Sequence, residues 1–65
     1  MEEIINILMK RDGLSRKEVI REIKSFIADA RQAIDEGRGF EVEDILASDL
    51  GLEPDYLFSM YDYFM

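Results

Sequence analysis

A long amphipathic stripe constrains the fold of this chain more than any other feature of its sequence. Just before it, Ser15 and Glu18 form the pattern of a capping box, in which a hydroxyl and a carboxylate satisfy backbone donors at a helix start. The apolar residues that follow recur at steps of three and four, which places them on one face of an α-helix. They are Val19, Ile20, Ile23, Phe26, Ile27, Ala30, Ala33 and Ile34. The sequence therefore predicts one long helix over about 16–36.

Glycine and proline divide the rest of the chain into three shorter helical segments. Residues 2–11 carry Ile4, Ile5, Leu8 and Met9 at helical spacing. Residues 40–50 repeat the pattern with Val42, Ile45, Leu46 and Leu50. Pro54 suits the first position of a last helix, because its missing N–H needs no partner there. We expect an all-α fold: a small bundle of about four helices around the long central helix, in a single helical domain over residues 1–65.

Several classes of function are disfavoured by residues that the chain lacks. It has no cysteine and no histidine, so it offers neither a disulfide framework nor the usual zinc ligands and general base. Carboxylate pairs such as Asp49 and Glu53 are close in sequence, but nothing suggests the apolar cleft that acid–base catalysis needs. The start is acidic, and no apolar run reaches the roughly 18 residues of a membrane span. We expect a cytoplasmic protein that is not an enzyme and needs no cofactor or metal.

The charge of the chain is distributed unevenly. Residues 1–38 contain all eight basic residues and eight acidic ones, so this half is neutral. Residues 39–65 contain seven carboxylates and no lysine or arginine, so they carry the whole net charge of −7. Such a half is expected to steer a basic partner toward itself.

The last ten residues are unusually aromatic. Five of the seven aromatic residues of the chain lie there, and one helix cannot turn all five toward a core. If Leu57, Met60, Tyr61 and Phe64 face inward, then Phe58 and Tyr63 are left at the edge or outside. The sequence therefore predicts an exposed aromatic patch beside carboxylates.

Direct binding of nucleic acid is not expected, although basic residues cluster near the start of the long helix. Lys17, Arg21 and Lys24 share a face of that helix. A sequence pI near 4.3 is far from that of a typical nucleic-acid-binding domain. No basic residue follows Arg38, so the helices around Gly51 lack the cations that dominate DNA affinity. The basic residues are better explained as a solvated face with local charge pairs.

Two sequence stretches carry a resemblance to other proteins. Leu8-Met9-Lys10-Arg11-Asp12-Gly13-Leu14-Ser15 precedes the long helix, and Ile45-Leu46-Ala47-Ser48-Asp49-Leu50-Gly51-Leu52-Glu53-Pro54-Asp55-Tyr56 lies near the end. This arrangement resembles short acidic helical proteins of phage and bacterial genomes, a group with no assigned activity. The resemblance implies a phage-like or accessory-element context and gives no catalytic residues. The aromatic tail after Tyr56 departs from the group.

These observations favour a small acidic module that binds a protein with a basic surface and acts as a regulator of a phage or accessory element. The expected contact residues are Glu41, Glu43, Asp44, Asp55, Phe58, Tyr61, Asp62 and Tyr63. One alternative is a homodimer that uses the aromatic tail as its seam, with the basic front of one chain near the acidic half of the other. Another is a nucleic-acid mimic, whose carboxylates imitate phosphates and inhibit a basic nucleic-acid-binding protein.

Overall fold

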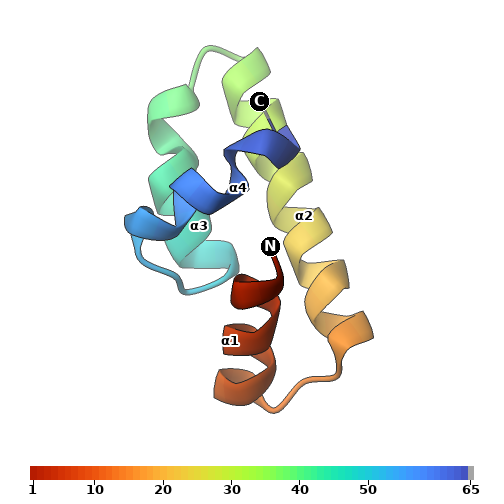
Figure 1. Ribbon diagram of the computed structural model, residues 1–65. Coiled ribbons are helices and arrows are strands. Elements are labelled where there is room, and N and C mark those ends of the chain that lie inside the picture. The colour runs from red at the N-terminus through yellow and green to blue at the C-terminus, as the bar shows by residue number, and fades with distance from the viewer. Residues whose placement is uncertain (65) are drawn as a thin grey trace.

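A computed structural model describes the backbone of residues 1–64 and the side chains of residues 1–60. This part of the chain consists of helices joined by short loops and contains no strand (Figure 1). The elements are α1 (Glu2–Asp12), α2 (Arg16–Asp35), the 3-10 segment η1 (Gly39–Glu41), α3 (Val42–Asp49), the 3-10 segment η2 (Pro54–Tyr56) and α4 (Leu57–Phe64). The predicted all-α bundle with one long helix is confirmed.

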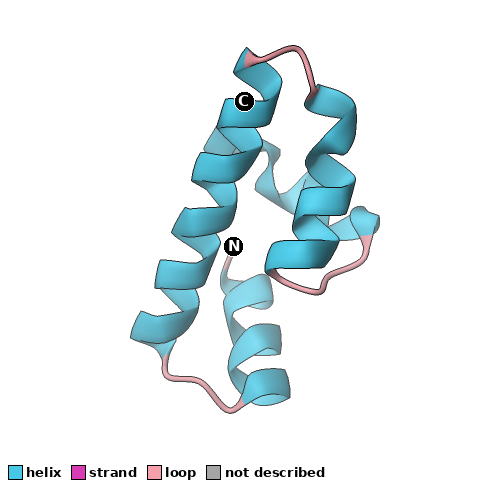
Figure 2. Ribbon diagram, turned by 180° about the vertical axis from the view of Figure 1, so that it is seen from behind, coloured by secondary structure: helices cyan, strands magenta, loops and turns pink. Residues whose placement is uncertain are grey.

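Helix α2 is the longest helix, and the other three helices pack against it. Its 20 residues span about 30 Å at the rise of an α-helix, and the longest dimension of the fold is 34 Å. In Figure 1, α1 lies beside the first half of α2, α3 lies beside the second half, and α4 crosses from α3 toward α2. Figure 2 shows the same arrangement from behind. In both views the side of α2 that is turned away from α1 and α3 carries no other helix.

All four helices contribute to one apolar core. Phe26, near the middle of α2, has no exposed surface and is the largest of the fully buried side chains. The predicted stripe of α2 is largely buried, with Ile20, Ile27 and Ile34 at its half-buried margin. The core residues are Ile4, Ile5, Leu8, Val19, Ile23, Phe26, Ala30, Val42, Leu46, Leu50, Leu52, Leu57 and Met60.

Both ends of α2 have defined caps. The Glu18 backbone N–H donates to Ser15 Oγ at 3.2 Å, as predicted, and Ser15 Oγ donates to the Glu18 carboxylate at 3.0 Å. At the other end, Gly37 has a φ of 78° and the Arg38 N–H donates back to Ala33 O at 2.7 Å. This is a Schellman arrangement, which a residue with a Cβ would strain.

The two C-terminal helices begin differently from the sequence-based expectation. The segment predicted over residues 40–50 starts with the 3-10 turn η1 before α3, and the last segment starts with η2 before α4. Such turns are common where a helix begins, because i→i+3 bonds close a tighter first turn. Pro54 occupies the first position of η2, as expected of a residue without an N–H.

Candidate binding surface

Three of the predicted contact residues lie together at the start of α3. Glu43 and Asp44 are exposed in its first turn, where their charge is favourable to the positive end of the helix dipole. Glu41 is half-buried in η1, and Arg38 Nη1 donates to its carboxylate at 2.9 Å. One of these three carboxylates is therefore already neutralised by a contact within the chain.

A second group of predicted residues belongs to the last two elements. Asp55 is exposed in η2, and the Phe58 side chain in α4 is 77% exposed. Leu57 and Met60 are buried, so the predicted division of this helix is confirmed for the side chains that are described. The side chains of Tyr61, Asp62 and Tyr63 lie outside the described residues.

Sequence reasoning missed the most exposed aromatic side chain. Phe40 in η1 is 81% exposed, and it is one residue away from Glu41. It stands four residues before Asp44, one helical turn along the same segment. Because Phe40 falls outside the spacing of Val42, Leu46 and Leu50, its exclusion from the core stripe was the signal that could have identified it.

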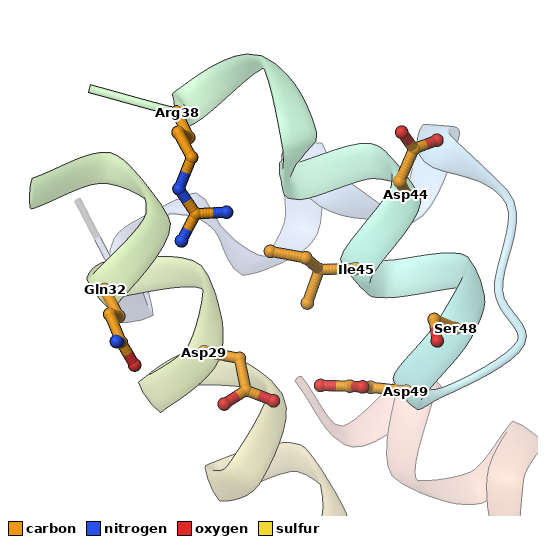
Figure 3. Close-up of a pocket in the computed structure, with 7 residues that line it drawn as sticks. All are labelled: Asp29, Gln32, Arg38, Asp44, Ile45, Ser48 and Asp49. Carbon is orange, nitrogen blue, oxygen red and sulfur yellow. The ribbon is translucent and has the colours of Figure 1, made fainter. Parts of the chain in front are cut away.

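A groove of about 380 Å³ lies between parts of α2 and α3 (Figure 3). Ile45 supplies an apolar wall, and the other lining residues are polar or charged. They are Asp29 and Gln32 from α2, Arg38 from the connection, and Asp44, Ser48 and Asp49 from α3. Only Asp44 among them was predicted as a contact residue.

Two carboxylates face each other across this groove. Figure 3 shows the side chains of Asp29 and Asp49 pointing toward one another from α2 and α3. Partial desolvation raises the pKa of the Asp49 carboxyl above its usual range, and a hydrogen bond with Asp29 and the charge of Asp29 raise it further. Two like charges held this close make the ionised pair unfavourable.

The cation that lines the groove is occupied elsewhere. The guanidinium of Arg38 forms ion pairs with Glu36 and Glu41, and both contacts raise the pKa of Arg38. None of the ion pairs between described side chains involves Asp29, Asp44 or Asp49. The groove therefore presents negative charge that no contact within the described residues balances.

Two arginines of the first half connect different elements of the fold. Arg11 donates to the carbonyl oxygens of Leu50 at 2.6 Å and Gly51 at 3.0 Å, which ties α1 to the end of α3. Arg16 pairs with Glu2. The Glu18 carboxylate accepts a hydrogen bond from Ser15 Oγ and forms no ion pair within the described residues.

Comparison of the chain with protein-family models, curated proteins and solved structures gives no match. The described residues contain no helix with the length and apolar character that crossing a membrane requires. They also contain no group of three carboxylates arranged to hold a metal ion.

Proposed function

We propose that this chain is a protein-binding module whose contact surface is its acidic C-terminal half. The observation that carries the proposal is the exposure of Phe40 and Phe58, at 81% and 77%. Among the described side chains they are the only large apolar residues classed as exposed, and both lie in the half that has no basic residue. Exposed aromatic rings supply contact area at low entropic cost, and such residues often dominate binding energy.

The charges around these rings indicate the chemistry of the partner. Glu43 and Asp44 follow Phe40 on the start of α3, and Asp55 precedes Phe58 in the chain. None of the three forms an ion pair within the described residues. A partner with lysine or arginine beside apolar side chains complements such a surface, and its association is expected to weaken as salt screens the charges.

Photo-cross-linking from defined positions tests the proposal. A photoreactive phenylalanine analogue is introduced at Phe58 or at Phe40 in cells that naturally express the chain. We expect each position to yield a covalent adduct with the same foreign protein. Replacing Phe58 with Ser should reduce capture of that protein about tenfold or more, the effect expected when a binding hot spot is lost.

Lys10 provides the control position, because it is exposed on α1 in the neutral half. The same analogue placed at Lys10 should give no such adduct. Adducts of equal yield at Lys10, or none at Phe40 and Phe58, contradict the proposal. An adduct with a second copy of the chain at Phe58 alone supports the alternative of an aromatic homodimer seam.

A further inference from the structure

A second stripe of α2, next to the one that enters the core, repeats at the spacing of a coiled coil. Its positions alternate steps of three and four, and basic residues alternate with isoleucine along it. The stripe consists of Lys17, Ile20, Lys24, Ile27, Arg31 and Ile34. Its basic members are exposed, and its isoleucines are half-buried where they pack at the margin of the core. Aliphatic surface between cations therefore stays accessible along α2.

The lysines of this stripe do not stabilise the fold through a described contact. Lys17, Lys24 and the neighbouring Arg21 are exposed and form no ion pair within the described residues. They are spaced by four and three residues, and like charges at these spacings destabilise a helix slightly. Lys17 also lies in the first turn of α2, where the helix dipole disfavours a cation. Contact with carboxylates of a partner would make all three charges favourable.

The heptad spacing indicates that the partner is a helix. In a parallel coiled coil, the residues at one heptad position of the first helix face the same position of the second. Two copies of α2 paired in this way would bring Lys17 and Lys24 against their own kind, so the lysines oppose self-pairing. A helix with acidic residues opposite the lysines and aliphatic residues opposite Ile20 and Ile27 satisfies both kinds of position.

Other anionic partners fit this stripe less well. A phosphate backbone has no apolar group to cover the isoleucines, and a long polyanion would be repelled by the net charge of −7. A lipid surface is held by large apolar side chains that insert into it. Among the described side chains, the large apolar ones that are exposed are Phe40 and Phe58, which belong to η1 and α4. A short acidic helix contacts only the neutral half of the chain, residues 1–38.

We propose that this stripe of α2 docks an acidic amphipathic helix of another protein. The carboxylates of that helix lie against Lys17 and Lys24. Its aliphatic side chains cover the accessible parts of Ile20 and Ile27. The exposed aromatic rings of the C-terminal half take no part in this contact, so the docking does not depend on the partner proposed for that half.

Titration of the isotope-labelled chain with synthetic peptides, followed by two-dimensional NMR, tests the docking. The probe is a peptide of about three heptads, with Glu at the first and Leu at the fourth position of each heptad. We expect a dissociation constant below about 1 mM, with the largest amide shifts in α2. A peptide of the same composition, permuted so that the heptad spacing is lost, should bind at least about tenfold more weakly.

Charge-reversed variants locate the contact. Lys24→Glu should weaken binding of the acidic peptide at least about tenfold. Lys10→Glu changes the net charge equally from an exposed position on α1 and should leave binding unchanged, as should Phe58→Ser. A chain with Lys17→Glu and Lys24→Glu should instead bind a peptide that has Lys in place of each Glu. Far-ultraviolet circular dichroism checks that each variant remains helical.

Several outcomes overturn the proposal. They are the absence of amide shifts at about 1 mM peptide, equal binding of the permuted peptide, and equal weakening by Lys10→Glu and Lys24→Glu. Tighter binding of single-stranded DNA or of phosphatidylglycerol vesicles, lost on Lys24→Glu, overturns it in favour of a phosphate ligand. Peptide binding that is lost only on Phe58→Ser assigns the peptide to the aromatic surface. Cross-linking of a foreign protein at Phe58 is scored separately, so failure of either proposal leaves the other testable.

Discussion

The carboxylates of the two halves of this molecule have different surroundings. In the first half, Glu2, Asp12 and Glu36 each contact an arginine, and these contacts lower the pKa of all three carboxyls. In the second half, the described carboxylate with a cation partner is Glu41, and its partner Arg38 comes from the first half. The pKa of Asp49 is raised instead. Arginines therefore favour the charged form of these carboxylates in the first half, whereas Asp44 and Asp49 in the second half have no ion pair within the described residues.

The two halves differ in electrostatics but share one hydrophobic core. Leu8 from α1 and Leu46 from α3 are both fully buried in the same cluster as Phe26. Arg11 also crosses between the halves, from α1 to the backbone at Leu50 and Gly51. We therefore expect the two halves to differ in electrostatics but to unfold together. Three sets of variants test this expectation, from the largest effect to the smallest.

The largest effect is expected from cavities in the shared core. Leu8→Ala and Leu46→Ala should each destabilise the chain by roughly 2–5 kcal/mol, because each removes fully buried methyl groups. A domain of 65 residues is marginally stable, so either variant should unfold at a much lower temperature than the wild-type chain. Thermal unfolding followed by far-ultraviolet circular dichroism measures both. One transition shared by all helices is expected in each variant.

The same variants also test whether the two halves fold as separate units. If Leu46→Ala melts only α3 and α4 while α1 and α2 keep their helicity, the halves are separate folding units as well as separate electrical regions. Residue-resolved amide hydrogen exchange distinguishes these cases, because a shared unit loses protection in α1 and α3 together.

The sequence was sufficient to predict the helices but not the groove between them. The periodicity from Val19 to Ile34 and the cap at Ser15 act locally, so α2 was predicted almost to its residue limits. Asp29 and Asp49 are 20 residues apart and become neighbours only because α3 packs against the second half of α2. No local pattern encodes that contact.

Only the part of the candidate surface that depends on local helical spacing was predicted from the sequence. Exposure of Phe58 followed from the spacing of its buried neighbours Leu57 and Met60. Phe40 lies in the 3-10 turn η1, outside the spacing of the buried residues of α3, and its exposure was missed. The role of Arg11 depends on two backbone carbonyls some 40 residues away, which composition and motif spacing do not reveal.

A smaller effect is expected from the glycines that end α1 and α3. Gly13 and Gly51 have φ values of 65° and 64°, so Ala at either position should cost about 1 kcal/mol or more in backbone strain. A Cβ at Gly51 would also lie 3.3 Å from Arg11 Nη1, whereas nothing lies within 4 Å of a Cβ at Gly13. Gly51→Ala should therefore be the more destabilising variant in chemical denaturation.

Removal of Arg11 identifies the source of that difference. In an Arg11→Ala background, the two glycine variants should cost nearly the same, because the guanidinium that crowds position 51 is gone. A difference that persists without Arg11 means that the two C-terminal caps differ for another reason, and that Arg11 does not couple the halves in the way the hydrogen bonds to Leu50 and Gly51 indicate.

The smallest effect is expected in how the stability of carboxylate variants in the two halves depends on pH. The folded-state pKa of Asp49 is raised, so the cost of ionising it in the groove is fully present above that pKa and absent below its unfolded value near 4. Asp49→Asn should therefore stabilise the chain at pH 7 by about a few tenths of a kcal/mol, a size consistent with a solvent-screened pair. The gain should disappear as the pH falls below about 4.

Glu2→Gln is the matched variant from the first half. The contact with Arg16 lowers the pKa of Glu2, so its contribution is present above the unfolded pKa and is lost as the pH falls through the folded value. This variant should therefore destabilise the chain at pH 7 and have progressively less effect in acid. Denaturation in dilute solution gives both differences as a function of pH. Because the two pKa values are shifted in opposite directions, the two variants should change the free energy of unfolding at pH 7 in opposite directions. Changes of the same sign would contradict the difference between the two halves.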